Sequence, residues 1–289
     1  MSTLDERLAR RTSLGTWTFD NRFSYRGGLG RIYGYDGSSE PPTDPGYTPT
    51  DPDATTYIAA VEAADGQALE DGVKAAYDDF FIGCKADGIW NAIKASCILA
   101  GARTLAGALV PLVGTAPTNF NFVSGDYDRE TGLTGDSISK YLDSNRRDDA
   151  DPQNSHHLSI YLTSTPTNNL AGVGISSTER ATRLIVGIAN SRGAGQVGMT
   201  TEINCLTAVG RSAVDAWQTY SGGILQTFTT SSASPVGFNH YIFAQNRSGT
   251  PGANSASRFA FYSIGESLDL AALDTRVSAL ITAIGAAIV

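Results

Sequence analysis

LSIYLT, residues 158–163, places aliphatic and aromatic side chains beside small hydroxyl-bearing ones. Ile, Tyr, Phe and Thr are enriched in β-strands, and a short run of this kind bounded by turn residues is typical of a strand. Four further runs share the pattern and lie between turn-forming residues: 183–188, 224–229, 240–244 and 258–263. Several short strands separated by turn signals predict a mainly β fold, an antiparallel sandwich.

The composition of the 289 residues agrees with a fold of many strands and turns. Glycine occurs 31 times and only 17% of the residues are charged, against about 25% in average proteins. The net charge is −8, whereas nucleic-acid-binding domains are usually strongly basic. We therefore expect no nucleic-acid partner.

Charge is distributed unevenly along the chain. Residues 34–90 hold twelve acidic and two basic residues, whereas residues 152–265 hold three acidic and six basic ones. Residues 1–53 combine glycine and aromatic side chains with a proline-rich run, which indicates an arm and an extended linker. The arm either becomes ordered against another subunit or adds a strand pair to the main domain. We expect four segments: arm and linker 1–53, helical segment 54–116, sandwich 117–265 and C-terminal helix 266–289.

Helical spacing appears on both sides of the predicted sandwich. In the front segment, apolar residues recur on one helix face, and Asp87 is placed to cap a short helix that carries Ile89, Trp90 and Ile93. That helix face consists of Leu69, Val73, Ala76, Tyr77 and Phe80. We therefore expect two helices before the strands begin.

The C-terminal segment has the spacing of a heptad repeat. Asp269 is a plausible N-cap, and the apolar residues alternate three and four apart: Leu270, Leu273, Val277, Leu280 and Ile284. Such a helix either packs against the sandwich or forms an oligomer seam. The second interpretation predicts a homotrimer.

Cysteine usage and hydropathy indicate a protein made in the cytoplasm. Cys84, Cys97 and Cys205 lack the spacing of a disulfide framework or a zinc site. The first eleven residues have no apolar core, so we expect no signal peptide. The most apolar stretch, residues 97–113, falls short of the roughly 20 apolar residues that a membrane span needs. We expect no membrane insertion.

Several stretches resemble virion structural proteins of tailed bacteriophages, including tail fibres. They are residues 77–95 (YDDFFIGCKADGIWNAIKA), Gly101 and residues 117–122 (PTNFNF), with residues 51–54 and 57–60 similar to the entry of the same module. Residues 132–135, 140–143 and 258–265 resemble the opening and closing strands of a concanavalin A-like, laminin-G-like jelly roll. The resemblance implies a virion appendage, a tail fibre or a head or tail spike, whose sandwich faces a host-surface polysaccharide. The arm would then contact other virion proteins.

Candidate glycan contacts lie in the predicted sandwich. Sugars stack on exposed aromatic rings and are oriented by amides and hydroxyls. Two clusters supply these groups: Trp217 with Tyr220, and Asn239, His240 and Tyr241 next to Phe238. Each Trp or Tyr of these clusters is more often packed in the core or at its rim.

A cluster of carboxylates precedes two histidines. Asp143, Asp148, Asp149 and Asp151 come shortly before His156 and His157, and lectin-like sandwiches often bind Ca²⁺ through loop carboxylates. Adjacent histidines on a strand point to opposite faces, which hinders joint ligation of one ion. We expect a solvated acidic turn, no metal and no cofactor.

Catalytic constellations are weak. Glu266 and Asp269 are three apart at a helix entry, whereas sandwich glycosidases set two carboxylates close together on one strand. The triplet 135–137 (GDS) lacks the preceding buried strand and a following Asp-x-x-His pair. We therefore expect no catalytic residues and a protein that is not an enzyme. A purely structural capsid or neck component and a capsule depolymerase remain the alternatives to a host-binding appendage.

Overall fold

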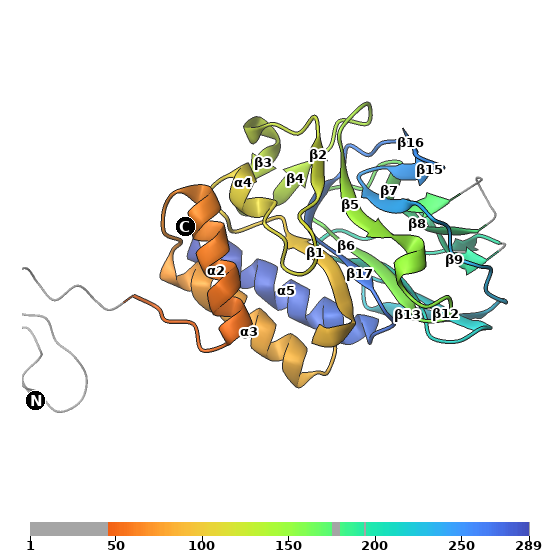
Figure 1. Ribbon diagram of the computed structural model, residues 1–289, viewed down its shortest axis with the longest axis horizontal. Coiled ribbons are helices and arrows are strands. Elements are labelled where there is room, and N and C mark those ends of the chain that lie inside the picture. Colours follow the sequence, from red (N-terminus) through yellow and green to blue (C-terminus); the bar gives the residue numbers. More distant parts are fainter. Residues whose placement is uncertain (1–45, 175–179, 194, 289) are drawn as a thin grey trace, which may run out of the picture. The chain divides into compact units, whose positions relative to one another are not determined.

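The structure, a computed structural model, describes residues 46–174, 180–193 and 195–288. Contacts divide the chain into two units, Met1–Gly46 and Tyr47–Val289. Most of the predicted arm, residues 1–45, lies outside the described residues, so its partner stays a prediction. The description below concerns the second unit (Figure 1).

Two helices open this unit. Helix α2 spans Pro52–Asp65, and the carboxylate of Asp51 caps it by accepting hydrogen bonds from the backbone N–H groups of Asp53 and Ala54. Helix α3 spans Asp71–Ala86 and buries the predicted apolar face, including Val73 and Tyr77. The short helix α4 follows at Leu105–Ala108. The helical spacing of the front segment is therefore confirmed for α3.

The residues after Asp87 differ from the prediction. Only the 3₁₀ turn η1, Trp90–Ala92, follows, and Ile93 begins strand β1, Ile93–Ile98. β1 pairs antiparallel with β17, Arg258–Gly265. The expected short helix was wrong because this long-range pairing, which no local spacing signals, supplies the backbone hydrogen bonds instead.

Two sheets form the rest of the unit. The first sheet has the order β13-β12-β11-β6-β17-β4-β3, with β1 also paired to β17. Its remaining strands are β3 Tyr127–Asp128, β4 Gly132–Thr134, β6 His156–Leu162, β11 Cys205–Arg211, β12 Ala216–Ser221 and β13 Ile224–Thr229. All of its pairs are antiparallel.

The second sheet has the order β10-β9-β8-β7-β14-β5-β2, and β15 pairs with both β7 and β16. Its strands are β2 Thr118–Phe120, β5 Tyr141–Arg147, β7 Asn169–Gly174, β8 Ala181–Ile185, β9 Ile188–Gly193, β10 Val197–Gly198, β14 Asn239–Ile242, β15 Gln245–Arg247 and β16 Thr250–Gly252. Its pairs are antiparallel except β15 with β7. Residues 183–188, predicted as one strand, hold the turn between β8 and β9, where Gly187 takes a φ of 75°.

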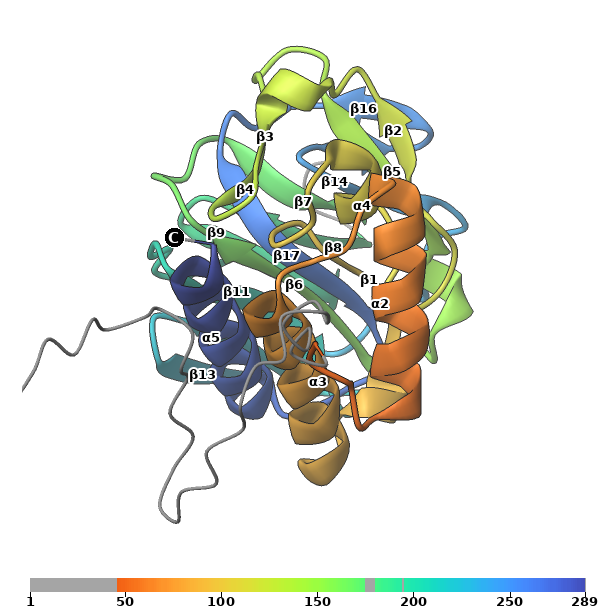
Figure 2. The same ribbon diagram turned by 90° about the vertical axis from the view of Figure 1, so that its left-hand side faces the viewer.

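Alternation along β6 sorts the core into two layers. Leu158 and Ile160 point toward the second sheet and join the apolar cluster between the sheets. Tyr161 points the other way, into a cluster with the helices. The unit is thus a helical layer, a first sheet and a second sheet, and Figures 1 and 2 show the helices gathered on one side. The predicted mainly β fold with a C-terminal helix is confirmed, and two antiparallel sheets are consistent with a sandwich.

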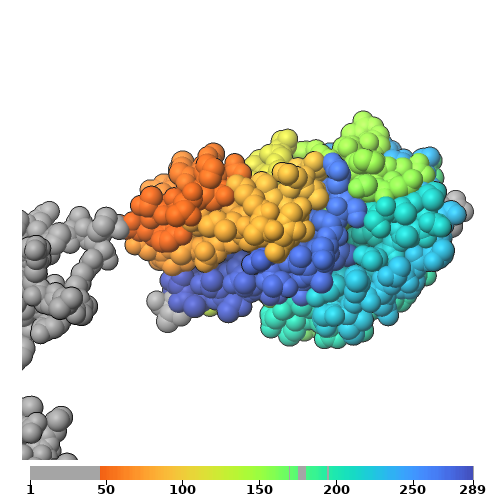
Figure 3. Space-filling view, turned by 90° about the horizontal axis from the view of Figure 1, so that it is seen from below, coloured from red at the N-terminus to blue at the C-terminus, as the bar shows by residue number. Residues whose placement is uncertain are grey.

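The C-terminal helix α5, Leu270–Ala287, begins as predicted. The carboxylate of Asp269 accepts hydrogen bonds from the N–H groups of Ala271 and Ala272. Its heptad residues, such as Leu273 and Val277, are buried with residues of α3 and the first sheet. Figure 3 shows α5, in blue, alongside the orange α3. The heptad face therefore packs within the chain, and the predicted trimer needs another contact surface.

Among the described helices, α5 is also the one that is long and apolar enough to cross a membrane by length and composition. A core helix of a soluble protein has the same properties. Here the helix is joined to α3 by an ion pair between Arg276 and Asp87, with Nε to Oδ2 at 2.7 Å.

Candidate functional site

The predicted aromatic residues of β12 are buried on opposite sides of the first sheet. Trp217 is 2% exposed and lies between the sheets, where its ring packs on Phe228 at a centroid distance of 4.9 Å. Tyr220 is 6% exposed, and its hydroxyl donates to Oδ2 of Asp274 on α5 at 3.0 Å. Stacking on a sugar needs an exposed ring face. The prediction that Trp217 and Tyr220 contact a sugar is therefore corrected, because both belong to the packing of the first sheet.

The predicted residues of β14 are separated by the same alternation. His240 points inward, with Nε2 at 3.4 Å from Oδ1 of Asp148. Tyr241 lies on the outer face of the second sheet. Asn239 is half-buried, and its carbonyl oxygen accepts a hydrogen bond from Nδ2 of Asn246 at 2.9 Å. His240 and Tyr241 are corrected as glycan contacts because they are only 2% and 7% exposed, whereas the half-buried Asn239 stays a candidate.

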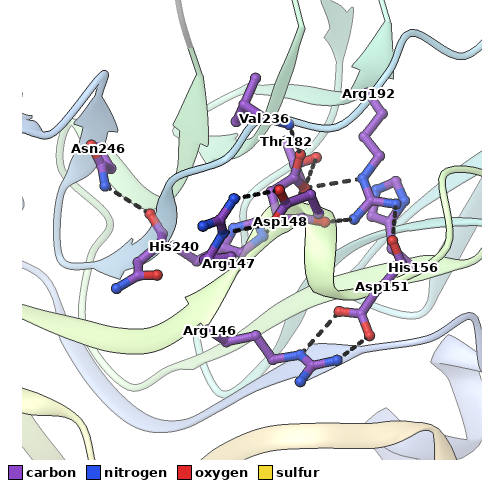
Figure 4. Close-up of polar contacts among 12 residues, drawn as sticks. Arg146, Arg147, Asp148, Asp151, His156, Thr182, Arg192, Val236, His240 and Asn246 are labelled. Atoms are coloured by element: carbon purple, nitrogen blue, oxygen red, sulfur yellow. Dashed lines mark hydrogen bonds and ion pairs between the residues drawn. The ribbon is translucent and has the colours of Figure 1, made fainter.

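His240 leads into a buried polar cluster centred on Asp148 (Figure 4). Asp148 lies in the 3₁₀ turn η3, Asp148–Ala150, which directly follows β5. Its Oδ1 accepts hydrogen bonds from Nε of Arg192 at 3.0 Å and from the Thr182 hydroxyl at 3.2 Å. Its Oδ2 accepts one from the backbone N–H of Val236 at 2.9 Å. Burial alone would raise the pKa of Asp148, but the hydrogen bond and charge of His240 and the charge of Arg192 hold it well below its usual range.

A second arginine satisfies backbone groups at the same end of the sandwich. Arg211 donates from Nε and Nη2 to the carbonyl oxygen of Ser191 at 3.2 and 2.7 Å, and from Nη1 to that of Thr230 at 3.0 Å. Burial lowers the pKa of Arg211 to about 10. The guanidinium therefore ties β11 to β9 and to the segment after β13.

The predicted solvated acidic turn is correct only in part: Asp149 is exposed and Asp143 half-buried, but the other two aspartates are not solvated. Asp148 and Asp151 are both buried, and Asp151 accepts hydrogen bonds from Arg146, including one from Nε at 3.1 Å. Across the described ranges, no group of three His, Cys, Asp or Glu side chains is arranged to hold a metal ion. Asp148 was misassigned because its basic partner Arg192 lies 44 positions away in the sequence. We interpret the cluster as structural, since it does not reach solvent.

The outer face of the second sheet carries a different set of side chains. Leu142 and Ile242 face the core between the sheets, so Tyr141, Asp143 and Tyr241 lie on the other face. There Tyr141 and Tyr241 are only 9% and 7% exposed and form a small buried cluster with Ala244. Three rings from neighbouring strands form a row, which we call the aromatic ladder: Phe120 on β2, Tyr141 on β5 and Tyr241 on β14. Phe120 stacks on Tyr141 at 4.4 Å, and Tyr141 lies 4.7 Å from Tyr241. The helices α2, α3 and α5 lie on the opposite side of the molecule (Figure 1).

Polar groups continue this face beyond the ladder. Tyr241 pairs with Gly172, which in turn pairs with Arg183 on β8 and with Gln245 on β15. Nε of Arg183 donates to Oδ1 of Asn190 at 2.7 Å. Burial, together with the nearby charge of Arg247, lowers the pKa of Arg183. Arg183, Asn190 and Gln245 are at most 3% exposed, so these polar groups pack within the second sheet and do not reach solvent.

Sequence reasoning found one member of the ladder and missed two. Phe120 and Tyr141 were quoted only as part of the family resemblance, in residues 117–122 and 140–143. The alternation Tyr141, Leu142, Asp143 was the available signal, because it sets an apolar residue between two outward-facing ones.

A shallow depression of about 330 Å³ lies on the helical side, lined by Asp53, Lys85, Gly88, Trp90 and Asn91. Nζ of Lys85 is 2.7 Å from carboxylate oxygens of both Asp51 and Asp53. These ion pairs neutralise the only cation that lines the depression. We therefore place the candidate site on the aromatic ladder and not here.

Comparison with known proteins gives a distant structural likeness. No protein-family model and no curated protein matches the chain. Among solved structures, the NanB sialidase from Streptococcus pneumoniae is similar: as a mutant (TM-score 0.37), in complex with a chlorobenzyl ammonioethanesulfonate (0.38) and with Optactamide (0.37). Each shares 13% identity over 51% of this chain and 27% of the sialidase chain. The chain thus spans well under half the length of that sialidase.

These neighbours are enzymes, so the prediction that the protein is not an enzyme is wrong on this comparison. The match gives no residue of this chain a catalytic role. Hydrolysis of a glycan is therefore measured beside binding in the experiment below.

Proposed function

We propose that the protein is a virion appendage whose sandwich, a concanavalin A-like jelly roll, binds a host-surface polysaccharide. The single observation that carries the binding proposal is the aromatic ladder on the outer face of the second sheet. The virion role rests on the resemblance of residues 77–95 and 117–122 to phage structural proteins.

The ladder has the chemistry that sugars require. Pyranose rings present apolar C–H faces that pack on aromatic side chains, and their hydroxyls need donors and acceptors nearby. Phe120 is 37% exposed, whereas Tyr141 and Tyr241 are 9% and 7% exposed, so Phe120 is the ring that a sugar can reach and the two tyrosines support it. Asp143 lies next to Tyr141 and Tyr241 on the same face, and burial and then the charge of Asp143 raise the pKa of Tyr241. A carboxylate beside stacked rings suits hydroxyl recognition.

Several copies on one particle would strengthen weak binding at each site. Linked sites increase avidity by roughly 10²- to 10⁴-fold without new contacts. In this proposal the arm over residues 1–53 attaches the protein to other virion proteins, and the ladder faces away from the particle.

The test compares two exposed apolar side chains. The wild-type protein is screened on an array of bacterial surface polysaccharides, and the dissociation constant for the best glycan is then measured. We expect Phe120→Ala to weaken binding about tenfold, because it removes the accessible ring, a loss of about 1.4 kcal/mol. Ile138→Ala is the matched control, since Ile138 is 81% exposed and lies outside the ladder.

Release of reducing sugar from the same glycan is measured in parallel. Binding with product release would make the protein a depolymerase, and binding without it a receptor-binding protein. If the protein binds no glycan on the array, or if both variants lose affinity equally, the ladder is not the binding site. That result would favour a capsid or neck component.

A further inference from the structure

One edge strand of the first sheet is long, regular and uncovered. β13 pairs with β12 along its whole length and has no partner among the described residues on its other side. The other outer strands, β2, β3, β10 and β16, have only two or three residues each. β1 is longer, but its free side is covered where Ser96 exchanges backbone hydrogen bonds with Leu112 and Val113. β13 is thus the exception to the usual protection of sheet edges.

The hairpin between β12 and β13 fixes which backbone groups face outward. Gly222 and Gly223 form a two-residue turn with φ of 57° and 78°, so the flanking Ser221 and Ile224 are hydrogen-bonded to each other. In an antiparallel pair such bonds occur at alternate residues. The N–H and C=O groups of Leu225, Thr227 and Thr229 therefore point away from β12.

β13 also lacks the usual devices that prevent strand pairing. Natural edges carry charges, prolines or bulges, but no Asp, Glu, Lys or Arg occurs between Asp215 and Arg247. The register with β12 is free of bulges. Ile224 and Leu225 at the turn end are 52% and 49% exposed. The strand is therefore both free to pair and apolar at one end.

The opposite end of β13 is apolar as well. Val214 is 55% exposed, and its carbonyl oxygen accepts a hydrogen bond from the N–H of Ser232 at 2.7 Å, just beyond the end of β13. An antiparallel copy of the strand would bring the turn end of one molecule to the far end of the other. Ile224 and Leu225 would then approach Val214 of the partner subunit.

We propose that β13 pairs antiparallel with β13 of a second copy of this chain, so that the first sheet continues across a two-fold dimer. The axis passes between the two Thr227 residues, and Leu225 lies opposite Thr229 of the partner subunit. A two-fold contact is self-complementary, and groups close to the axis meet their own copies, so like charges there would repel one another and an uncharged surface favours the contact. The uncharged β12–β13 hairpin meets that requirement, although the chain as a whole carries a net charge of −8.

The dimer is tested on the full chain by light scattering over a range of concentrations. The wild-type protein is expected to have twice the monomer mass. Thr227→Pro is expected to raise the dissociation constant at least tenfold: it removes an outward N–H and leaves the hydrogen bonds to β12 intact. Ile138→Pro is not suitable as a control. We therefore compare a second pair of variants, Leu225→Lys and Ile138→Lys, each of which places a charge at an exposed apolar position. Only Leu225→Lys is expected to dissociate the dimer.

A cross-linking variant tests the register without relying on dissociation. Hydrogen-bonded antiparallel partners have Cα atoms about 5.5 Å apart, within the range of a disulfide. Thr227→Cys is therefore expected to form a covalent dimer on mild oxidation, whereas Ile138→Cys is not. The native Cys84, Cys97 and Cys205 are buried and give little background. A monomeric wild-type protein, or equal cross-linking of both variants, would overturn the proposal.

Discussion

Arg192→Leu is expected to lower the free energy of unfolding by about 3–5 kcal/mol, because it leaves the Asp148 carboxylate buried without its arginine partner. Both side chains are 1% exposed, and Nε of Arg192 lies 3.0 Å from Oδ1 of Asp148. The substitution also removes the donor to the carbonyl oxygen of Pro152. Urea unfolding at pH 7, followed by circular dichroism, measures the change.

Arg147→Leu is the control for this result. Arg147 precedes Asp148 directly and pairs with Asp149, with Nη2 to Oδ2 at 2.6 Å, but its side chain is 58% exposed. Exposed ion pairs contribute little to stability, so no measurable change is expected. A double replacement of Arg192 and Asp148 by leucine should restore part of the loss, because no unpaired charge is left buried. Equal stability of the Arg192→Leu and Arg147→Leu proteins would contradict the role of the cluster.

The protein is expected to lose stability as the pH falls from about 6.5 toward 4, the range that begins at the ordinary pKa of histidine. Burial holds the pKa of His156 well below its usual range and lowers that of His157 to about 4. The unfolded chain therefore binds protons in this range that the folded chain does not bind. For His157 the lowering of the pKa in the folded protein corresponds to about 3 kcal/mol of unfolding free energy, at about 1.4 kcal/mol per pKa unit.

A second loss is expected at lower pH. The pKa of Asp148 is held low in the folded protein, so its contribution is present above the ordinary aspartate pKa and disappears as the pH falls through the folded value. Both steps are followed by urea unfolding at intervals between pH 7.5 and pH 3, a range chosen to include both ordinary pKa values of about 6.5 and 3.9.

His157→Gln isolates one contribution to this profile. His157 is held by Nδ1 at 2.6 Å from the carbonyl oxygen of Glu266 and by Nε2 at 2.6 Å from the Ser263 hydroxyl. The variant is expected to be less stable at pH 7 but to show a shallower decline between about pH 6.5 and 4. The chain has three histidines, all buried, so no exposed imidazole obscures the result. An unfolding free energy that is constant over this range would refute the interpretation.

Local patterns predicted much of the secondary structure. The run 224–229 is β13 residue for residue, and Asp269 caps α5 as its position before an apolar repeat indicated. These features depend on neighbours within a few positions along the chain. The heptad spacing of α5 was equally local. It did not show whether the apolar face of the helix packs against another chain or against its own sheet.

The candidate site was predicted in residue type but not in place. Trp217 and Tyr220 have the chemistry of a sugar site, yet β12 turns one into the core and the other toward α5. Side-chain alternation says that two residues face opposite sides, and only the packing of the sheets decides which side meets solvent. Tyr241 likewise lies on the face away from the core, yet packing against Tyr141 leaves it only 7% exposed.

The sequence by itself determined some strands, such as β13, the buried face of α3 and the cap of α5, because each follows from a local pattern of a few residues. Only the tertiary structure decided which distant side chains contact one another. Asp148 and Arg192 are 44 positions apart, and their pairing converts an apparent acidic turn into a buried ion pair. Phe120, Tyr141 and Tyr241 likewise become one ladder only through strand register, since contacts between distant segments depend on the packing of the whole chain and not on local spacing.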